Sequence, residues 1–252
     1  MKILVCVKRV PMTGGRIVLT DDERAIATRH LGFTISPHEE CAVEEAVRLV
    51  AAHGGEVVVL TLGVAEAAEQ LRDCMAIGAD RGILLETDGE EWDAQATAQA
   101  IVDAVRADGD GFDLILFGNE SADVGNYQVG IRVAYALGRP VVNGLKGIAL
   151  DGSGAVRCER EAPGGRDVYV VPLPAVLTVL EGLNLPRYPS VPGRLRAKSK
   201  PLAVTTPARP EPKLELLRLK LPPGSGKSAE ILGEGPSAAP RVVEVLQQLG
   251  VA

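Results

Sequence analysis

Apolar runs rich in β-branched residues recur through the first half of this chain, and segments with helical periodicity separate them. The apolar runs lie at residues 2–7, 56–61, 82–85 and 113–117. The segments with helical periodicity lie at residues 40–52, 65–77 and 94–107. Continuous apolar runs are typical of strands buried on both faces, and their alternation with helices favours a parallel sheet. We therefore predict a doubly wound, mostly parallel α/β fold of the Rossmann-like, nucleotide-binding kind.

Beyond Gly138 the pattern changes to short β-like runs. These runs lie at residues 155–158, 168–171 and 175–179. A loop with Pro163-Gly164-Gly165 joins the first two, which predicts an antiparallel hairpin that extends the sheet or covers its edge. The stretch 185–240 is rich in Pro, Lys and Arg and is expected to form an extended arm. The amphipathic helix predicted at 240–249 needs a surface to lie on.

Composition narrows the class of protein. The 252 residues are 46% hydrophobic, enough for one large domain with an arm. No apolar run approaches the roughly 20 residues that cross a bilayer, and the N-terminal segment is short for a signal peptide. We expect a soluble, cytoplasmic protein without membrane insertion. The formal net charge of −6 argues against a nucleic-acid partner. The four cysteines lack metal-site spacing, so we expect buried free thiols and no metal.

The segment Gly118 to Gly130 follows an apolar run and opens a helical pattern. A strand, a loop of small residues and a helix N-terminus present backbone N–H groups and a positive dipole end to an anion. Asp123, Asn126 and Gln128 could hydrogen-bond a ribose or a phosphate, and Gly125 and Gly130 allow a close backbone approach. The stretch favours a phosphate-bearing ligand, and a polar loop that only caps its helix is the alternative.

Three other features favour structural interpretations. Gly224 to Ser228 resembles the end of a phosphate loop, but the first glycine of that motif falls on Leu221, so we expect a flexible linker. His38 precedes a helix without a nucleophile pattern nearby, which gives no support to side-chain catalysis. Glu44 and Glu45 are expected on the solvated face of their helix.

A basic segment runs from Arg187 to Lys200 without an acidic residue. It includes Tyr188, and prolines on either side restrict the backbone around Val191. Two interpretations remain open for it: a solvated basic loop, or a protein-docking surface with one apolar anchor and a basic rim.

Together these segments resemble the beta subunit of the electron transfer flavoproteins, in order from residue 2 to about 200. The resemblance lies in 7–11 (VKRVP), 42–46 (AVEEA), 78–82 (GADRG), 118–130, 159–161 (ERE), 173–176 (LPAV) and 183–189 (LNLPRYP). It implies a heterodimer whose alpha subunit holds most of an FAD. That FAD passes electrons from acyl-CoA or other flavin dehydrogenases to a membrane quinone oxidoreductase, as in fatty acid oxidation. The chain would be an electron-carrier subunit and not an enzyme.

The resemblance also implies particular site residues. Beta subunits of this family usually bury one AMP. The matching positions here are Cys6, Ser36, Pro37, His38, Glu39, Leu62, Asp123, Gly125, Asn126, Gln128, Val129 and Gly130. His38 matches a position near the flavin ring. Val191 matches the recognition-loop anchor, usually leucine, so Arg187, Tyr188 and Val191 are expected to dock partner proteins. No catalytic residue and no metal ligand is implied.

The resemblance implies three parts and leaves some questions open. Residues 1–185 would form the nucleotide-binding domain, 186–200 the recognition loop, and 201–252 an arm whose helix packs on the alpha subunit. Electron-bifurcating relatives hold a second FAD in place of AMP, and the shortened acidic loop around Asp123 does not choose between them. Donors, acceptor and flavin potential are likewise not specified. A rival from another class is an adenine-nucleotide hydrolase or sensor, although Arg9 to Met12 replace its SGGxD loop. A third class is a purely structural partner protein that binds no ligand.

Overall fold

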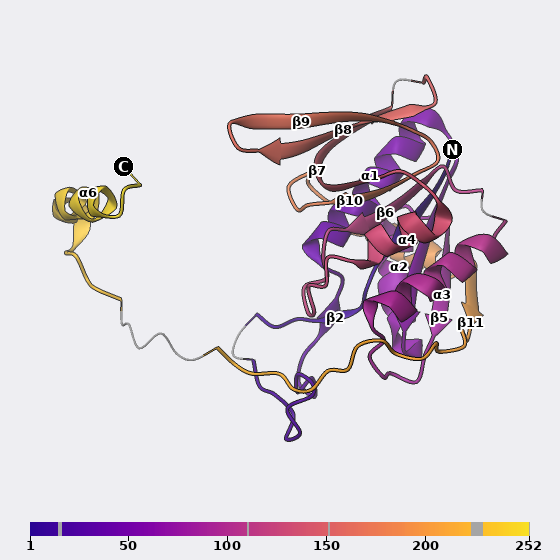
Figure 1. The fold of residues 1–252 in the computed structure, drawn as a ribbon, viewed down its shortest axis with the longest axis horizontal. Helices are drawn as coiled ribbons and strands as arrows, with labels where there is room; N and C mark the ends of the chain where they lie inside the picture. Colours follow the sequence, from indigo (N-terminus) through magenta and orange to yellow (C-terminus); the bar gives the residue numbers. More distant parts are fainter. Residues whose placement is uncertain (15–16, 110, 151, 223–228, 252) are drawn as a thin grey trace.

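The computed structural model describes residues 1–14, 17–109, 111–150, 152–222 and 229–251. The linker expected at Gly224 to Ser228 lies outside these residues. Within them, a large sheet has the strand order β11-β5-β4-β1-β6-β10-β7-β8-β9, as Figure 1 shows. Its strands are β1 (Lys2–Cys6), β4 (Glu56–Gly63), β5 (Arg81–Glu86), β6 (Leu114–Gly118), β7 (Val141–Leu150), β8 (Ala155–Ala162), β9 (Gly165–Pro172), β10 (Ala175–Val179) and β11 (Leu202–Thr205). A separate short ladder pairs β2 (Val10–Pro11) with β3 (Phe33–Thr34).

Helices cover both faces of the sheet. The main helices are α1 (Pro37–His53), α2 (Ala68–Ile77), α3 (Ala94–Ala107), α4 (Val129–Leu137), α5 (Val191–Ala197) and α6 (Ala239–Gln248), with 3₁₀ turns η1 (Ala65–Ala67) and η2 (Gly235–Ala238). Side chains alternate along each strand, so Ile3 and Val5 pack with α1 and α2. Leu4 and Cys6 face the other way and pack with α3 and α4. The predicted doubly wound fold is confirmed.

Strand order reverses beside β1. Val5 of β1 pairs in parallel with Val59 of β4 and with Leu116 of β6. The chain builds outward from β1 through β4 and β5 on one side and through β6 and β10 on the other. The carboxyl ends of β1, β4 and β6 therefore meet at a switch point, where open α/β sheets bind their ligands.

The predicted hairpin is confirmed as β8 and β9, and it extends the sheet. Antiparallel pairing runs from Ala155 opposite Pro172 to Ala162 opposite Gly165. Strand β7, which the sequence pattern did not predict, joins the hairpin to β10. Tyr169 and Val171 face the core, whereas Val168 and Val170 are exposed.

The basic segment contains a helix that packs closely on α2. A Cβ atom at Gly193 of α5 would lie 2.5 Å from the Ala76 carbonyl oxygen, so only glycine permits this approach. Arg72 of α2 donates to the carbonyls of Ala197 (2.6 Å) and Lys200 (2.7 Å). Lys200 in turn donates to the carbonyls of Met75 (3.0 Å) and Ala79 (2.6 Å). Each helix thus has its carboxyl end capped by a cation that the other segment supplies.

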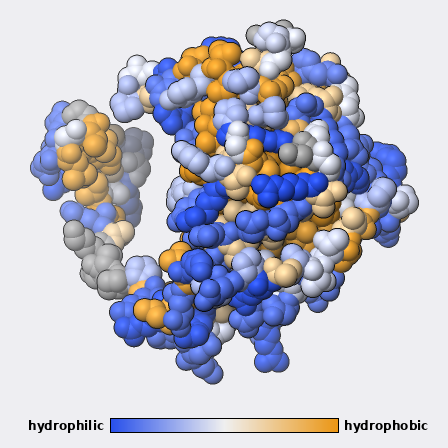
Figure 2. All heavy atoms as spheres, turned by 45° about the vertical axis from the view of Figure 1, so that its right-hand side comes forward, coloured by the Kyte–Doolittle hydropathy of each residue, from blue (hydrophilic) through white to orange (hydrophobic). Residues whose placement is uncertain are grey.

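The region predicted as an arm begins in the sheet. Residues 202–205 form β11, which pairs in parallel with β5 at the edge. The following chain crosses the lower side of the molecule in Figure 1 and ends at α6, far from the sheet. Val242, Val243 and Leu246 of α6 are exposed, and Figure 2 shows this helix apart from the body, with apolar side chains among its residues.

One expectation about surface charge is wrong. Glu44 and Glu45 of α1 are buried, with relative exposures of 2% and 9%. Segment 184–187 covers them: Asn184 donates to the Glu45 carboxylate at 2.9 Å, and Arg187 binds Glu44. Asn184 and Arg187, which lie 139 and 143 residues away along the chain, provide the hydrogen bonds that water would provide to a carboxylate at the surface.

Replacing Lys200 with methionine should destabilise the protein by about 1–2 kcal/mol, because the ammonium caps two carbonyls at the end of α2. Methionine keeps much of the aliphatic part of the lysine side chain, so the loss of stability can be attributed to the hydrogen bonds of the ammonium group. Urea unfolding measures the change, and Lys198→Met, at an exposed neighbouring position, is the control. Equal stability of the two variants would contradict the capping role.

Candidate functional site

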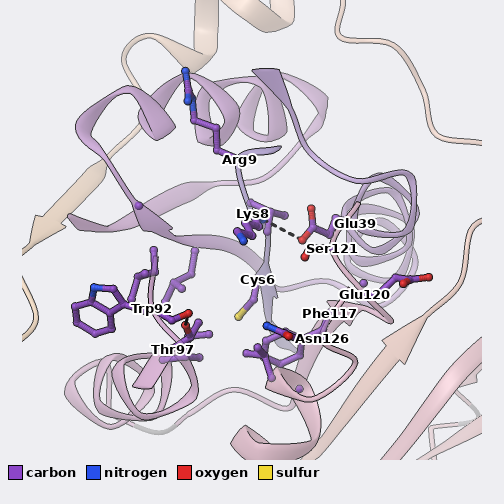
Figure 3. Close-up of a pocket in the computed structure, with 18 of the residues that line it drawn as sticks. Cys6, Lys8, Arg9, Glu39, Trp92, Thr97, Phe117, Glu120, Ser121 and Asn126 are labelled. Carbon is purple, nitrogen blue, oxygen red and sulfur yellow. Dashed lines mark hydrogen bonds between the residues drawn. The ribbon is translucent and has the colours of Figure 1, made fainter. Parts of the chain in front are cut away.

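A cavity of about 280 Å³ opens at the carboxyl ends of β1, β4 and β6. Its walls include apolar residues from three strands: Cys6, Leu60 and Phe117. Ile101 of α3 and Trp92 line it as well, and Figure 3 shows the labelled residues around it. Figure 3 also shows polar groups from the loops after β1 and β6, among them Lys8 and Asn126, and from helices, namely Glu39 and Thr97. The cavity thus combines an apolar interior with a polar entrance.

The structure brings the predicted nucleotide residues to this end of the sheet. Seven of them line the cavity: Cys6, Glu39, Leu62, Asn126, Gln128, Val129 and Gly130. Four others line an adjoining hollow: Pro37, His38, Asp123 and Gly125. Ser36 lines neither space. It is completely buried, and its hydroxyl accepts a hydrogen bond from the Ala122 N–H at 2.9 Å. Ser36 therefore holds the loop in place from behind.

Glu39 joins the start of α1 to the end of β1. One carboxylate oxygen accepts the Lys8 N–H at 3.0 Å, and the other accepts the Ser36 N–H at 2.9 Å. The side chain also passes close to β6, since a Cβ atom at Gly118 would lie 2.8 Å from Glu39 Cγ. Burial raises the pKa of Glu39 to about 8, although the two N–H donors favour the ionised form. A titratable group is therefore built into the cavity wall.

Lys8 links two loops across the entrance. Its ammonium lies 2.7 Å from the Glu91 carboxylate and 2.8 Å from that of Asp123. Burial by itself would raise the pKa of Asp123, but the Lys8 ammonium outweighs this effect and lowers the pKa below its usual value. Arg9, the other cation at the cavity, stacks on the Phe33 ring at 3.3 Å from its centroid. The Lys8 ammonium is thus paired with two carboxylates, whereas the Arg9 Nε has no hydrogen-bond partner among the described residues.

The sequence reasoning missed Lys8, Arg9, Glu91 and Trp92 as residues of this cavity. A usable signal existed for the first two, because both directly follow β1 and so lie at the end of the sheet where ligands bind. Glu91 and Trp92 belong to a loop after β5. Its course back toward β1 depends on long-range contacts that no local pattern reveals.

The N-terminus of α4 faces the cavity through Val129 and Gly130. The first intrahelical bond runs from the Arg132 N–H to the Gln128 carbonyl, and helix geometry leaves the N–H groups of 129–131 without intrahelical acceptors. Gly130 allows α4 to lie close to β6 and β10, since a Cβ atom there would lie 2.9 Å from Thr178 Cγ2. Gly125 has a φ of 58°, a conformation that favours glycine. The arrangement suits an anion.

His38 is held at the rim. Its Nδ1 accepts the Glu181 N–H at 2.6 Å, so the proton of the neutral ring lies on Nε2, 3.6 Å from the Glu120 carboxylate. Among the described residues, no group of three or more His, Cys, Asp or Glu is arranged to hold a metal ion. All four cysteines are buried and free, which confirms the expectation of buried free thiols.

The expected docking residues lie on a segment fixed to α1. Arg187 binds the buried Glu44 with two hydrogen bonds of 2.8 Å, and this geometry holds the backbone before α5. Tyr188 and Val191 are 96% and 74% exposed. The segment that Arg187 fixes to α1 thus exposes the side chains of Tyr188 and Val191 to solvent. Along the ranges that the structure covers, none of the helices has the length and apolarity needed to span a bilayer.

Comparisons with known proteins agree on one family. The sequence matches the electron transfer flavoprotein domain over residues 24–210. It is 38% identical to the electron transfer flavoprotein subunit beta of Syntrophomonas wolfei, an alignment that covers 97% of this chain and 95% of that relative. Identity to the same subunit of Bacillus subtilis is 33%, with 98% of each chain covered. The caffeyl-CoA reductase-Etf complex subunit CarD of Acetobacterium woodii is 32% identical, over 81% of this chain and 78% of the relative.

Replacing Glu39 with glutamine should change how stability depends on pH. The acid has a pKa near 4.5 when unfolded and about 8 when folded, so between these values the folded protein retains a proton that the unfolded chain has lost. The contribution of Glu39 is therefore complete below the lower value and declines by about 1.4 kcal/mol per pH unit toward the upper one. Glutamine does not titrate, so the variant lacks this decline.

Urea unfolding between about pH 5 and pH 8 measures the two slopes. The exposed Glu161→Gln should keep the wild-type slope. Parallel stability curves for the wild type and Glu39→Gln would show that Glu39 stays ionised throughout.

Proposed function

The chain belongs to the family of electron transfer flavoprotein beta subunits, and on that premise we propose that it forms a heterodimer with an alpha subunit and binds AMP. Electron transfer is the activity of this family. We propose that flavin dehydrogenases, among them acyl-CoA dehydrogenases, are the donors and a membrane quinone oxidoreductase the acceptor. The cytoplasm remains the predicted compartment.

The cavity at the switch point is the observation that carries the AMP proposal. Its interior offers apolar contacts from Cys6, Leu60 and Phe117 to a planar heterocycle. The N–H groups at the start of α4 suit a phosphate. A cavity of about 280 Å³ lies at the small end of ligand sites and favours a mononucleotide.

FAD supplies the one- and two-electron chemistry, and we propose that the alpha subunit holds most of it. His38 is the residue of this chain proposed to lie near the flavin ring. The Glu181 N–H fixes the orientation of its imidazole, so Nε2 is available at the rim. This chain would then position the cofactor from one side without taking part in bond making.

The exposed segment around α5 is proposed to dock donors. Val191 would enter an apolar pocket on the dehydrogenase, while Arg187 holds the segment in one position. The apolar residues of α6 are proposed to pack on the alpha subunit, which would cover a helix that is exposed in the chain by itself.

A second candidate is a bifurcating complex with a second FAD in place of AMP. The similarity to a subunit of the caffeyl-CoA reductase-Etf complex favours it. The hollow lined by His38 and Asp123 adjoins the cavity at Glu120 and Ser121, so a longer ligand has a direction in which to extend. The hydrolase and sensor alternatives gain no support from the family match over residues 24–210.

The heterodimer purified with its alpha subunit should contain one FAD and one AMP. Acid release followed by chromatography measures both nucleotides per complex. Two FAD without AMP would establish the bifurcating alternative. A chain that binds nucleotide but forms no stable flavin-containing complex would contradict the electron-carrier proposal.

Val191→Leu should tighten docking of an acyl-CoA dehydrogenase, because one more buried methylene contributes about 0.8 kcal/mol, or roughly fourfold in affinity. Val191→Asp should weaken docking by about tenfold or more, since a carboxylate would enter an apolar pocket. The measurement is the concentration dependence of flavin reduction by the dehydrogenase, at unchanged FAD content. Val168→Asp, on the exposed face of β9, is the matched control. Equal behaviour of all three variants would remove Val191 from the docking surface.

A further inference from the structure

The C-terminal arm touches the loop that forms one wall of the cavity. Arg209 donates to the Glu91 carbonyl at 2.8 Å, and its guanidinium lies 6.0 Å from the centroid of the Trp92 ring. Glu91 and Trp92 both line the cavity. Figure 1 shows the arm passing below β5 and α3, on the side where this loop lies. The arm is therefore in contact with one wall of the cavity.

Asp93 makes the second connection. One carboxylate oxygen caps α3 by accepting the Ala96 N–H at 2.7 Å. The other accepts the N–H groups of Lys213 (2.6 Å) and Leu214 (3.1 Å) of the arm. Burial opposes ionisation of Asp93, but these N–H groups outweigh it and lower its pKa. A single carboxylate thus joins the start of α3 to the arm.

These contacts continue across the cavity entrance. Glu91, whose carbonyl binds the arm, uses its carboxylate to bind Lys8, and Lys8 also binds Asp123. The path runs from the arm through loop 90–93 and Lys8 to the loop that precedes α4. Each link is charged or charge-assisted, which makes it stronger than a neutral hydrogen bond. Releasing the arm would free one wall of the cavity.

We propose that residues 209–214 of the arm are positioning residues of the nucleotide site, which hold loop 90–93 against Lys8 and thereby slow the release of AMP. The inference rests on the proposed AMP site. It adds that retention of the nucleotide depends on a segment leading to the helix proposed to pack on the alpha subunit. Occupancy of the cavity and the position of the arm are then coupled, in both directions.

The test uses the purified heterodimer loaded with labelled AMP, and it follows exchange against excess unlabelled AMP. Arg209→Ala removes one contact to the loop. Asp93→Ser removes the oxygen that binds the arm but keeps a hydroxyl to cap α3. Both variants should release AMP about three- to tenfold faster than the wild type, as expected for the loss of a charge-assisted hydrogen bond. Lys220→Ala, an exposed basic position of the same arm, should release it at the wild-type rate.

Hydrogen exchange of the amides in loop 87–93 provides a second readout, and it should accelerate in the first two variants only. Wild-type release rates in both variants would overturn the coupling. Faster release in Asp93→Ser alone would show that the Arg209 contacts do not hold the loop, which would overturn the proposed path through Glu91. A wild-type complex that holds FAD but no AMP would instead contradict the proposed AMP site, and the inference with it.

Discussion

Strand β1 pairs in parallel with β4 on one side and β6 on the other, and this pairing brings together the three segments that build the cavity. A parallel strand must be followed by a crossover before the next one, so each strand end carries a loop at the same edge. The loops after β1, β5 and β6, together with Glu39 of α1, supply the polar entrance, whereas the last residues of β1, β4 and β6 supply the apolar interior. The position of each strand in the sheet thus determines which residues line the cavity.

The charges at the entrance favour recognition of phosphate by the backbone. Glu39, Glu90, Glu91 and Glu120 line the cavity, and Asp123 lies beside it. Lys8 is bound to two of these carboxylates, and the Arg9 guanidinium stacks on an aromatic ring, with its Nε lacking a hydrogen-bond partner among the described residues. The start of α4 presents N–H groups that suit an anionic ligand without carrying a full charge. This arrangement favours one phosphate over several, because each further phosphate would approach more carboxylates.

Much of the fold was predictable, because buried parallel strands and amphipathic helices have distinct periodicities. Strands β1, β4, β5 and β6, the hairpin and the loop before α4 follow from local patterns. Strand β7 did not, since its exposed and buried residues alternate weakly around Gly144 and Gly147. The contacts of Lys8 and Trp92 also escaped local reasoning. They join loops that lie next to each other only after β1 has paired with its neighbours.

Helix α1 shows why the error about its surface matters. Glu39, Glu44 and Glu45 are all buried on this one helix; Glu39 meets the N–H groups of Lys8 and Ser36, whereas Glu44 and Glu45 meet segment 184–187. A buried carboxylate without partners would be strongly destabilising, so these contacts fix the segments that supply them. Glu39 thereby fixes the cavity wall, while Glu44 and Glu45 fix the segment before α5. The cavity and the exposed segment around α5 are consequently both joined to α1 through three buried carboxylates, two of which the helical pattern had assigned to the solvent.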